Sequence, residues 1–245
     1  MESLIKRFYK IHFAGSVIKS IWTIITPLLL SFAIAFIFKQ VFLIQEVDMS
    51  MTIISGYIFW QLIASSILRG HRQIKDNRLF FKQLTNTRTK FLISYILFNF
   101  LLALPGILLL SIYSWLIFSC SVIKILTLIS SVIFLLFCLS GILFVLASWT
   151  VFYPDLSHGI ETLFLFLLWL SPVFYKIESL PDSIKAIALY NPLAWFLDLI
   201  RYSLGLGYYY SPVVSLSLFG SFSITAYIFG LFYYKKHLKE LIKFL

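Results

Sequence analysis

The fold depends first on the stretch Leu180–Gly207, which reads LPDSIKAIALYNPLAWFLDLIRYSLGLG. Within it, two short amphipathic runs meet at Asn191-Pro192. Proline cannot donate the helical hydrogen bond, and it disfavours the α conformation for the residue before it. Gly205 and Gly207 stand where glycines commonly end a helix. The stretch therefore predicts a broken pair of helices, and strongly apolar segments lie on both sides of it.

The apolar composition sets the class of protein. Of the 245 residues, 60% are hydrophobic, 19% are aromatic and only 12% are charged, and the mean hydropathy is +0.94. Apolar runs of about 20 residues are long enough to cross the roughly 30 Å hydrocarbon core of a bilayer. We therefore predict an all-α integral membrane protein with a single transmembrane domain over residues 1–245.

Six apolar segments are predicted to cross the membrane. They lie at about residues 20–38, 51–68, 91–118, 125–149, 160–175 and 212–234. Residues 1–19 begin with an amphipathic run that predicts a helix at the membrane interface, with a disordered basic tail as the alternative. Residues 235–245 predict an amphipathic tail. In the last span Ser217, Ser221 and Thr225 repeat every four residues, which indicates close helix packing within this chain or between subunits.

The distribution of Lys and Arg predicts the orientation. With six spans both termini share one side, which holds fifteen of the 20 basic residues, and the other side holds five. Basic residues collect in cytoplasmic loops, so both termini are predicted to be cytoplasmic and Leu180–Gly207 extracytoplasmic. The same rule explains the net charge of +10 without nucleic acid, since no basic run is interleaved with aromatic residues on a soluble domain.

The second run of the opening stretch has one apolar and one charged face. In a helix the apolar face would consist of Leu193, Phe196, Leu197, Ile200 and Leu204. Asp198 and Arg201 lie on the other face, three residues apart, so they are expected to pair with each other. We therefore expect this helix pair to rest on or dip into the outer leaflet, with Asn191-Pro192 as a fixed elbow.

Two segments on the predicted cytoplasmic side stand out. Asn77–Leu84, NRLFFKQL, places three consecutive large apolar residues in the most charged loop of the chain. It is either a solvated loop or, as we favour, a short helix that docks Leu79, Phe80 and Phe81 into another protein. In a second loop Tyr153-Pro154 stops one helix, and Asp155 or Ser157 is expected to cap the next.

The chemistry missing from the chain is informative. It has no G-x-x-x-x-G-K-[ST] nucleotide-binding loop, and all four histidines lie outside the predicted spans. No charged residue lies deep within a span, and Glu161 lies only at an edge. Ion-coupled transporters and intramembrane enzymes generally need ionisable groups at membrane depth. We therefore predict no catalytic residue, and if the protein moves a substrate, the energy comes from a partner.

The cysteine and aromatic residues do little to distinguish one function from another. Cys120 and Cys138 would lie about 27 Å apart on one helix, too far for a disulfide, and no Cys/His cluster indicates a metal. Uncharged spans rich in Trp, Tyr and Phe would suit a sugar pathway, because aromatic faces stack on sugar rings. Ordinary aromatic belts at the membrane interfaces are the alternative explanation.

A series of motifs resembles one family of membrane proteins. From the N-terminus they are GSVIKSIWTIITP (Gly15–Pro27), GYIFWQLI (Gly56–Ile63), NRLFFKQL (Asn77–Leu84), Asp155-Leu156, LLWLSPVFY (Leu167–Tyr175), Leu180-Pro181 and YNPLAWFLDLIRYSLGLG (Tyr190–Gly207). In this order they resemble the permease subunits of ABC transporters that export O-antigen, capsule or teichoic acid. Two positions depart from that pattern: Lys19 replaces a usual Gly, and Pro154 replaces a usual Arg.

The resemblance implies partners and roles. Two copies of the chain would form one pathway for a lipid-linked polysaccharide within the membrane lipids, and two copies of a separate ATPase would bind on the cytoplasmic face. This chain would carry no cofactor, and the partner would bind ATP and Mg. The ATPase-coupling residues would be Asn77, Arg78, Leu79, Phe80, Phe81, Lys82, Asp155 and Glu161. The channel or outer gate would use Trp169, Tyr175, Tyr190, Asn191, Pro192, Trp195, Asp198 and Arg201.

Three other functions stay open at this point. The same architecture could export a drug, a peptide or a small lipid. A membrane-embedded enzyme acting on lipid-linked sugars would need acid or base groups near the outer surface, where the candidates are Glu178, Asp182, Asp198 and Arg201. A purely structural subunit is the third alternative.

Overall fold

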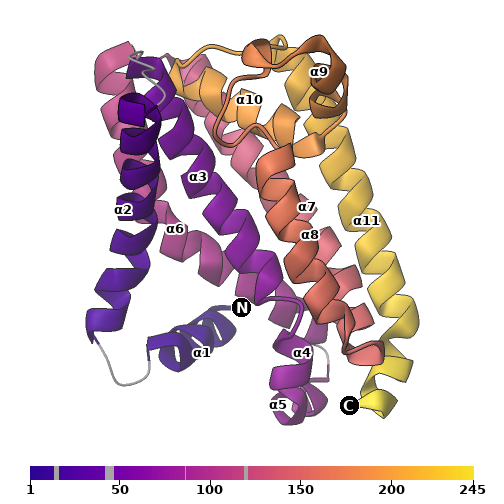
Figure 1. The fold of residues 1–245 in the computed structure, drawn as a ribbon. Coiled ribbons are helices and arrows are strands. Elements are labelled where there is room, and N and C mark those ends of the chain that lie inside the picture. The colour runs from indigo at the N-terminus through magenta and orange to yellow at the C-terminus, as the bar shows by residue number, and fades with distance from the viewer. Residues whose placement is uncertain (14–16, 42–46, 86, 119–120) are drawn as a thin grey trace.

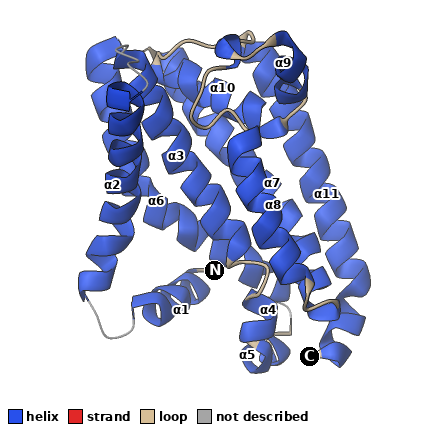
Figure 2. Ribbon diagram, in the orientation of Figure 1, coloured by secondary structure: helices blue, strands red, loops and turns tan. Residues whose placement is uncertain are grey.

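The computed structural model describes residues 1–13, 17–41, 47–85, 87–118 and 121–245. Helices dominate this part of the chain, and it contains no strand (Figures 1 and 2). The all-α prediction is therefore confirmed. Residues 14–16 of the predicted interfacial segment and Cys120 lie outside the described residues.

The helices follow one another along the whole chain. Their bounds are α1 Glu2–Phe13, α2 Val17–Val41, α3 Val47–Leu68, α4 Gln73–Asp76, α5 Arg78–Gln83, α6 Arg88–Phe118, α7 Val122–Phe152, α8 Leu156–Leu170, α9 Asp182–Leu189, α10 Pro192–Leu204 and α11 Pro212–Phe244, with a 3-10 turn, η1, at Ile177–Ser179. The predicted last span and tail form one uninterrupted helix, α11.

The long helices form a bundle whose two ends differ. Four described helices are long and apolar enough to cross a membrane, namely α3 from Met49, α6, α7 and α11. The apolar parts of α2 (Ile25–Gln40) and α8 are shorter. Figure 1 shows α4, α5 and the C-terminus at one end, called here the α4–α5 end, and α9 and α10 at the opposite end, called the α9–α10 end.

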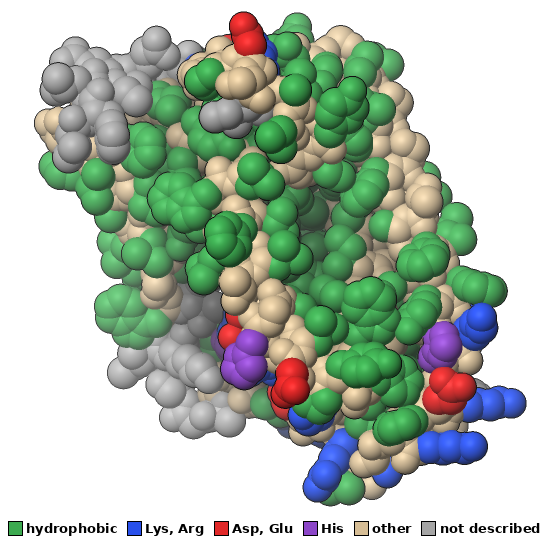
Figure 3. Space-filling model, turned by 45° about the vertical axis from the view of Figure 1, so that its right-hand side comes forward, with side chains coloured by type: hydrophobic (Ala, Val, Ile, Leu, Met, Phe, Trp, Pro, Cys, Tyr) green, Lys and Arg blue, Asp and Glu red, His purple; other side chains and the backbone are tan. Residues whose placement is uncertain are grey.

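Side chains on the surface follow the same division. On the face drawn in Figure 3, apolar side chains cover the middle of the molecule and most charged side chains gather at the α4–α5 end. The lysines of the last turns of α11, among them Lys235, Lys239 and Lys243, are exposed there. An apolar girdle with a charged end is the surface expected of a membrane protein.

The closest helix packing joins α7 and α11. A Cβ atom on Gly141 would lie 2.2 Å from the Ala226 carbonyl oxygen, and one on Gly230 would lie 2.1 Å from the Gly141 carbonyl oxygen. The two backbones therefore touch, as small residues allow in membranes. Ser217, Ser221 and Thr225 instead lie exposed on the other face of α11. They therefore do not pack within this chain, and the alternative of packing between subunits stays a prediction.

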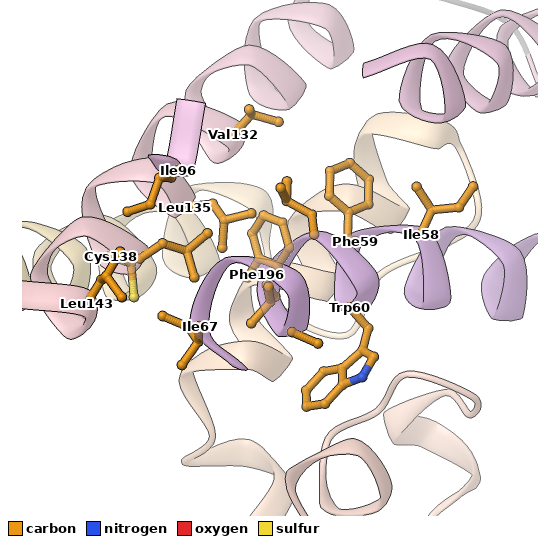
Figure 4. Packing of buried hydrophobic residues seen from close by; sticks show 14 of the residues in the cluster. Ile58, Phe59, Trp60, Ile67, Ile96, Val132, Leu135, Cys138, Leu143 and Phe196 are labelled. Carbon is orange, nitrogen blue, oxygen red and sulfur yellow. The ribbon is translucent and has the colours of Figure 1, made fainter. Parts of the chain in front are cut away.

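Helix α10 is buried among the long helices at the α9–α10 end. Phe196 is fully buried, with its ring 5.5 Å from that of Phe59 in α3 (Figure 4). The Phe219 ring of α11 lies 5.2 Å from the same ring. Helix α10 therefore lies within the bundle and does not rest on its surface, and the alternative that it dips into the leaflet stays a prediction. Its charged face is buried as well, because α3, α6, α7 and α11 cover it on several sides.

Helix α1 packs against the part of α6 near the α4–α5 end. Its amphipathic pattern is confirmed, since Leu4 and Phe8 are buried and Lys6 and Lys10 are exposed. The Phe8 ring lies 5.2 Å from the Phe91 ring. The segment thus forms a docked helix over Glu2–Phe13 rather than a disordered tail.

Candidate functional site

The elbow between α9 and α10 is held by the side chain of Asn191. Its Oδ1 accepts a hydrogen bond from the Leu193 N–H at 2.9 Å, and its Nδ2 donates to the Ser171 Oγ at 2.9 Å. Pro192 occupies the first position of α10, where a missing N–H costs nothing. The predicted broken helix pair is confirmed, and its elbow is tied to the residue that follows α8.

Asp198 fastens α10 to the start of α11. Its carboxylate accepts hydrogen bonds from the N–H of Tyr209 at 2.7 Å, the N–H of Tyr210 at 3.0 Å and the hydroxyl of Ser215 at 3.0 Å. Burial raises the pKa of the Asp198 carboxyl, and these three donors, with the charge of Arg201, act in the opposite direction. The carboxylate therefore holds the turn before α11 and the first turn of α11 against α10.

Arg201 does not form the expected pair with Asp198. It is 4% exposed and donates from a terminal guanidinium nitrogen to the Pro172 carbonyl oxygen, while its Nε is buried without a partner. No ion pair joins the two side chains, both of which lie in the described part of the chain. Burial lowers the pKa of Arg201 to about 10, so the guanidinium stays charged at neutral pH. Arg201 thus provides a second tie between α10 and the segment after α8.

The aromatic residues of the predicted gate divide into two groups. The Tyr175 hydroxyl lies 3.1 Å from the Leu170 carbonyl oxygen, and Trp195 Nε1 donates to the Leu189 carbonyl oxygen at 2.8 Å, so both hold local structure. Trp169 is 66% exposed and Tyr190 is 83% exposed. These last two rings therefore have the most exposed surface of the four.

Sequence reasoning missed the polar residues that close the α9–α10 end. Ser114 and Trp115 of α6 donate to the carbonyl oxygens of Leu204 and Ser203, the latter at 3.1 Å. Gly205 adopts φ 77°, and the helix ends there as its position predicted. Ser171 and Ser215 were missed too, because a serine in an apolar segment gives no signal of which carbonyl or carboxylate lies beside it.

At the α4–α5 end, the apolar residues of α5 face in different directions. Phe81 is fully buried, with its ring 5.8 Å from the Phe91 ring. Phe80 is half-buried beneath the Arg7 guanidinium, which lies 3.7 Å from its ring centroid. Leu79 is 73% exposed. The prediction that all three dock into another protein must therefore be corrected, since Phe81 belongs to the interior of this chain.

The remaining predicted coupling residues lie around the same end. Asn77 Nδ2 donates to the Gln73 carbonyl oxygen at 3.2 Å, and Arg78 and Lys82 are exposed. Asp155 is exposed at the start of α8, but its side chain makes no capping hydrogen bond, and Ser157 lies inside the helix. The capping expected of these two residues is therefore not observed.

One ion pair connects the two predicted coupling segments. Arg72, just before α4, donates to the Glu161 carboxylate of α8 at 2.6 Å. The two side chains are 39% and 46% exposed, so water weakens their attraction. The pair nevertheless joins the start of α4 to the first half of α8, which sequence spacing alone did not indicate.

A buried histidine lies beside this ion pair. His71 is fully buried, with Nδ1 3.1 Å from the Thr150 Oγ1 of α7 and Nε2 without a partner. Burial, followed by the charge of Arg72, lowers the pKa of His71 to about 4. The imidazole is therefore neutral at physiological pH, and it holds the turn between α3 and α4 against the end of α7.

Known proteins are similar to this chain over most of its length. The model of the family described as "ABC-2 type transporter" matches residues 1–204. The O-antigen export system permease protein RfbA of Klebsiella pneumoniae is 27% identical over 195 residues, which cover 76% of this chain and 72% of the relative. A second Klebsiella pneumoniae protein of the same name is 25% identical over the same shares.

Proposed function

We propose, from the premise that this chain belongs to the ABC-2 type transporter membrane family, that it exports a cell-surface polysaccharide. Membership makes the chain the membrane subunit of a transporter rather than an enzyme, and a multi-pass protein of the inner membrane. The proposal of a polysaccharide rests on one observation, the similarity to two O-antigen export permeases over three quarters of the chain. The cargo is proposed to be lipid-linked.

The proposed assembly contains two copies of this chain and two copies of an ATPase that binds ATP and Mg. In it each chain crosses the membrane six times, with α2 and α8 added to the four longer helices. The α4–α5 end faces the cytoplasm, consistent with fifteen of the 20 basic residues on that side. The ATPase contacts Leu79, Arg78 and Lys82, whose side chains are exposed around α5.

One ion pair and several hydrogen bonds form a path by which a movement of the ATPase reaches the outer end of the chain. A push on α5 moves the turn that carries Arg72, and the ion pair with Glu161 passes this movement to α8. The residue after α8, Ser171, is bonded to Asn191 at the elbow of α10. Because Asp198 makes α10 rigid with the start of α11, α10 would move as one body and open or close the exit.

A genetic experiment tests the proposed cargo. Deleting the gene should remove the long-chain polysaccharide from the cell surface and leave the glycan inside the cell, and the wild-type gene should restore export. The matched pair Leu79→Asp and Lys75→Gln then separates coupling from expression, since both residues are exposed in the same region. Normal surface glycan in the deletion strain, together with altered sensitivity to a drug, would instead favour the small-molecule exporter.

A further inference from the structure

A groove runs along the bundle between α2, α3 and α6. It consists of an apolar cavity of about 710 Å³ towards the α9–α10 end and a narrow notch of about 70 Å³ towards the α4–α5 end. Leu28, Ile58 and Gly106 line both parts, so the groove is continuous. Each of the three helices contributes one of these residues.

The notch carries four polar side chains among apolar ones, although it lies between helices of the bundle. Gln61 and Ser65 lie four residues apart on α3, Arg69 follows four residues later in the turn just after α3, and Asn99 lines the same notch from α6. The helical rise places Gln61 about 12 Å deeper than Arg69. The notch therefore carries a polar stripe from the end of the bundle into the hydrocarbon region.

Two members of this stripe lack a partner. Ser65 donates to the Leu62 carbonyl oxygen at 3.1 Å and Asn99 donates to the Tyr95 carbonyl oxygen at 2.9 Å. Gln61 has no hydrogen bond and Arg69 has no ion pair with any residue that the structure describes. An amide without a partner in hydrocarbon costs several kcal/mol, so a polar group is expected to enter the notch.

We propose that the groove binds the lipid anchor of the exported glycan, an apolar chain that ends in a phosphate. The phosphate interacts with Arg69 and with the amide of Gln61, and the chain occupies the apolar cavity. This inference rests on the proposed function. A resting membrane phospholipid has the same chemistry, but its phosphate stays at the headgroup level, whereas the polar stripe continues about 12 Å inwards. That depth suits a headgroup that is being drawn across the membrane.

Gly106 offers a position from which a larger side chain can enter the groove. A Cβ atom there would meet only the Cγ2 of Ile58, at 3.8 Å, which is an ordinary contact. Gly106→Phe therefore places a ring where the two cavities join. Leu108→Phe is the matched control, because Leu108 is 50% exposed and lies outside the groove.

The test measures binding of defined lipids to the purified full-length chain by native mass spectrometry. The probes are hexadecyl phosphate, hexadecanol and phosphatidylglycerol. Wild type should bind hexadecyl phosphate at least about tenfold more tightly than hexadecanol, as expected of one charge-assisted contact. Arg69→Gln should abolish this preference, and Gln61→Leu should reduce it. Gly106→Phe should lower the binding of both single-chain probes about tenfold or more. Lys75→Gln, Gln40→Leu and Leu108→Phe should behave like wild type.

Three results would overturn the inference. They are an unchanged preference in Arg69→Gln, unchanged binding in Gly106→Phe, and binding of phosphatidylglycerol as strong as that of hexadecyl phosphate, which would assign the groove to an ordinary membrane lipid. Because binding is measured without transport, its failure leaves the proposed function standing. Conversely, normal surface glycan after gene deletion would refute the proposed function without changing the binding result.

Discussion

The polar groups at the two ends of the bundle differ in burial and in bonding. At the α9–α10 end, Asp198 and Arg201 are buried and bonded within the chain. At the α4–α5 end, Leu79 is exposed and the Arg72–Glu161 pair is half-exposed. Buried bonded groups hold elements in one relative position, whereas exposed groups remain available to a partner. In the proposed transporter, the α9–α10 end is therefore a rigid closure of the bundle, and the α4–α5 end is the surface on which the ATPase acts.

The largest expected effect is a loss of stability when a buried residue of α5 is replaced, compared with an exposed residue of the same helix. Phe81→Ala empties a fully buried site against Phe91 and should cost about 3–5 kcal/mol of unfolding free energy. Leu79→Ala should change stability little, since the side chain is 73% exposed, but should weaken binding of the ATPase. Thermal unfolding in detergent and co-purification of the ATPase measure these effects. Equal destabilisation by both substitutions would contradict the division between interior and surface.

The next effect tests the rigid closure. Asp198→Asn replaces a carboxylate that accepts three hydrogen bonds with an amide that has only one acceptor oxygen. The amide oxygen can keep at most the bonds that share one carboxylate oxygen, and the amide NH2 then faces the remaining donor, so the substitution should cost about 2–3 kcal/mol. Asp182→Asn, at an exposed residue of α9, is the matched control. If both variants unfold at the wild-type temperature, the carboxylate does not fasten α10 to α11.

A smaller effect appears as a pH dependence. The pKa of His71 is about 4 in the folded chain and about 6.5 when the chain is unfolded. Between these values the unfolded chain binds a proton that the folded chain does not, so the free energy of unfolding should fall as the pH decreases from 6.5 to 4. His71→Asn should flatten this slope. Unfolding curves recorded across that pH range give the comparison, and identical slopes for both proteins would refute a buried neutral imidazole.

The smallest effect on stability concerns the ion pair. A double-mutant cycle with Arg72→Gln and Glu161→Gln should give a coupling energy of at most about 1 kcal/mol, because both side chains are half-exposed. The same variants should nevertheless reduce glycan export more than they reduce ATP hydrolysis. Export that falls in strict proportion to hydrolysis would remove the ion pair from the proposed path of movement.

The ends of helices could be predicted from the sequence, but the packing between distant helices could not. Asn191-Pro192 and Gly205 marked the ends of helices correctly, because capping depends on neighbouring residues. Helical periodicity placed Asp198 and Phe81 on their helices, but it could not show that other helices cover them. The repeat of small residues at Ser217 does not mark the packing face of α11 within this chain, since Gly230 on another face makes the backbone contact.

The most direct test of the central claim uses vesicles that contain this chain together with its ATPase. Lipid-linked glycan is supplied on the side of the α4–α5 end, and its arrival on the opposite side is measured with a glycan-specific probe. We predict transfer that requires ATP, the ATPase and this chain, and that is lost in Leu79→Asp. Transfer that proceeds without ATP, or no transfer of glycan while ATP is hydrolysed by an intact complex, would contradict the claim.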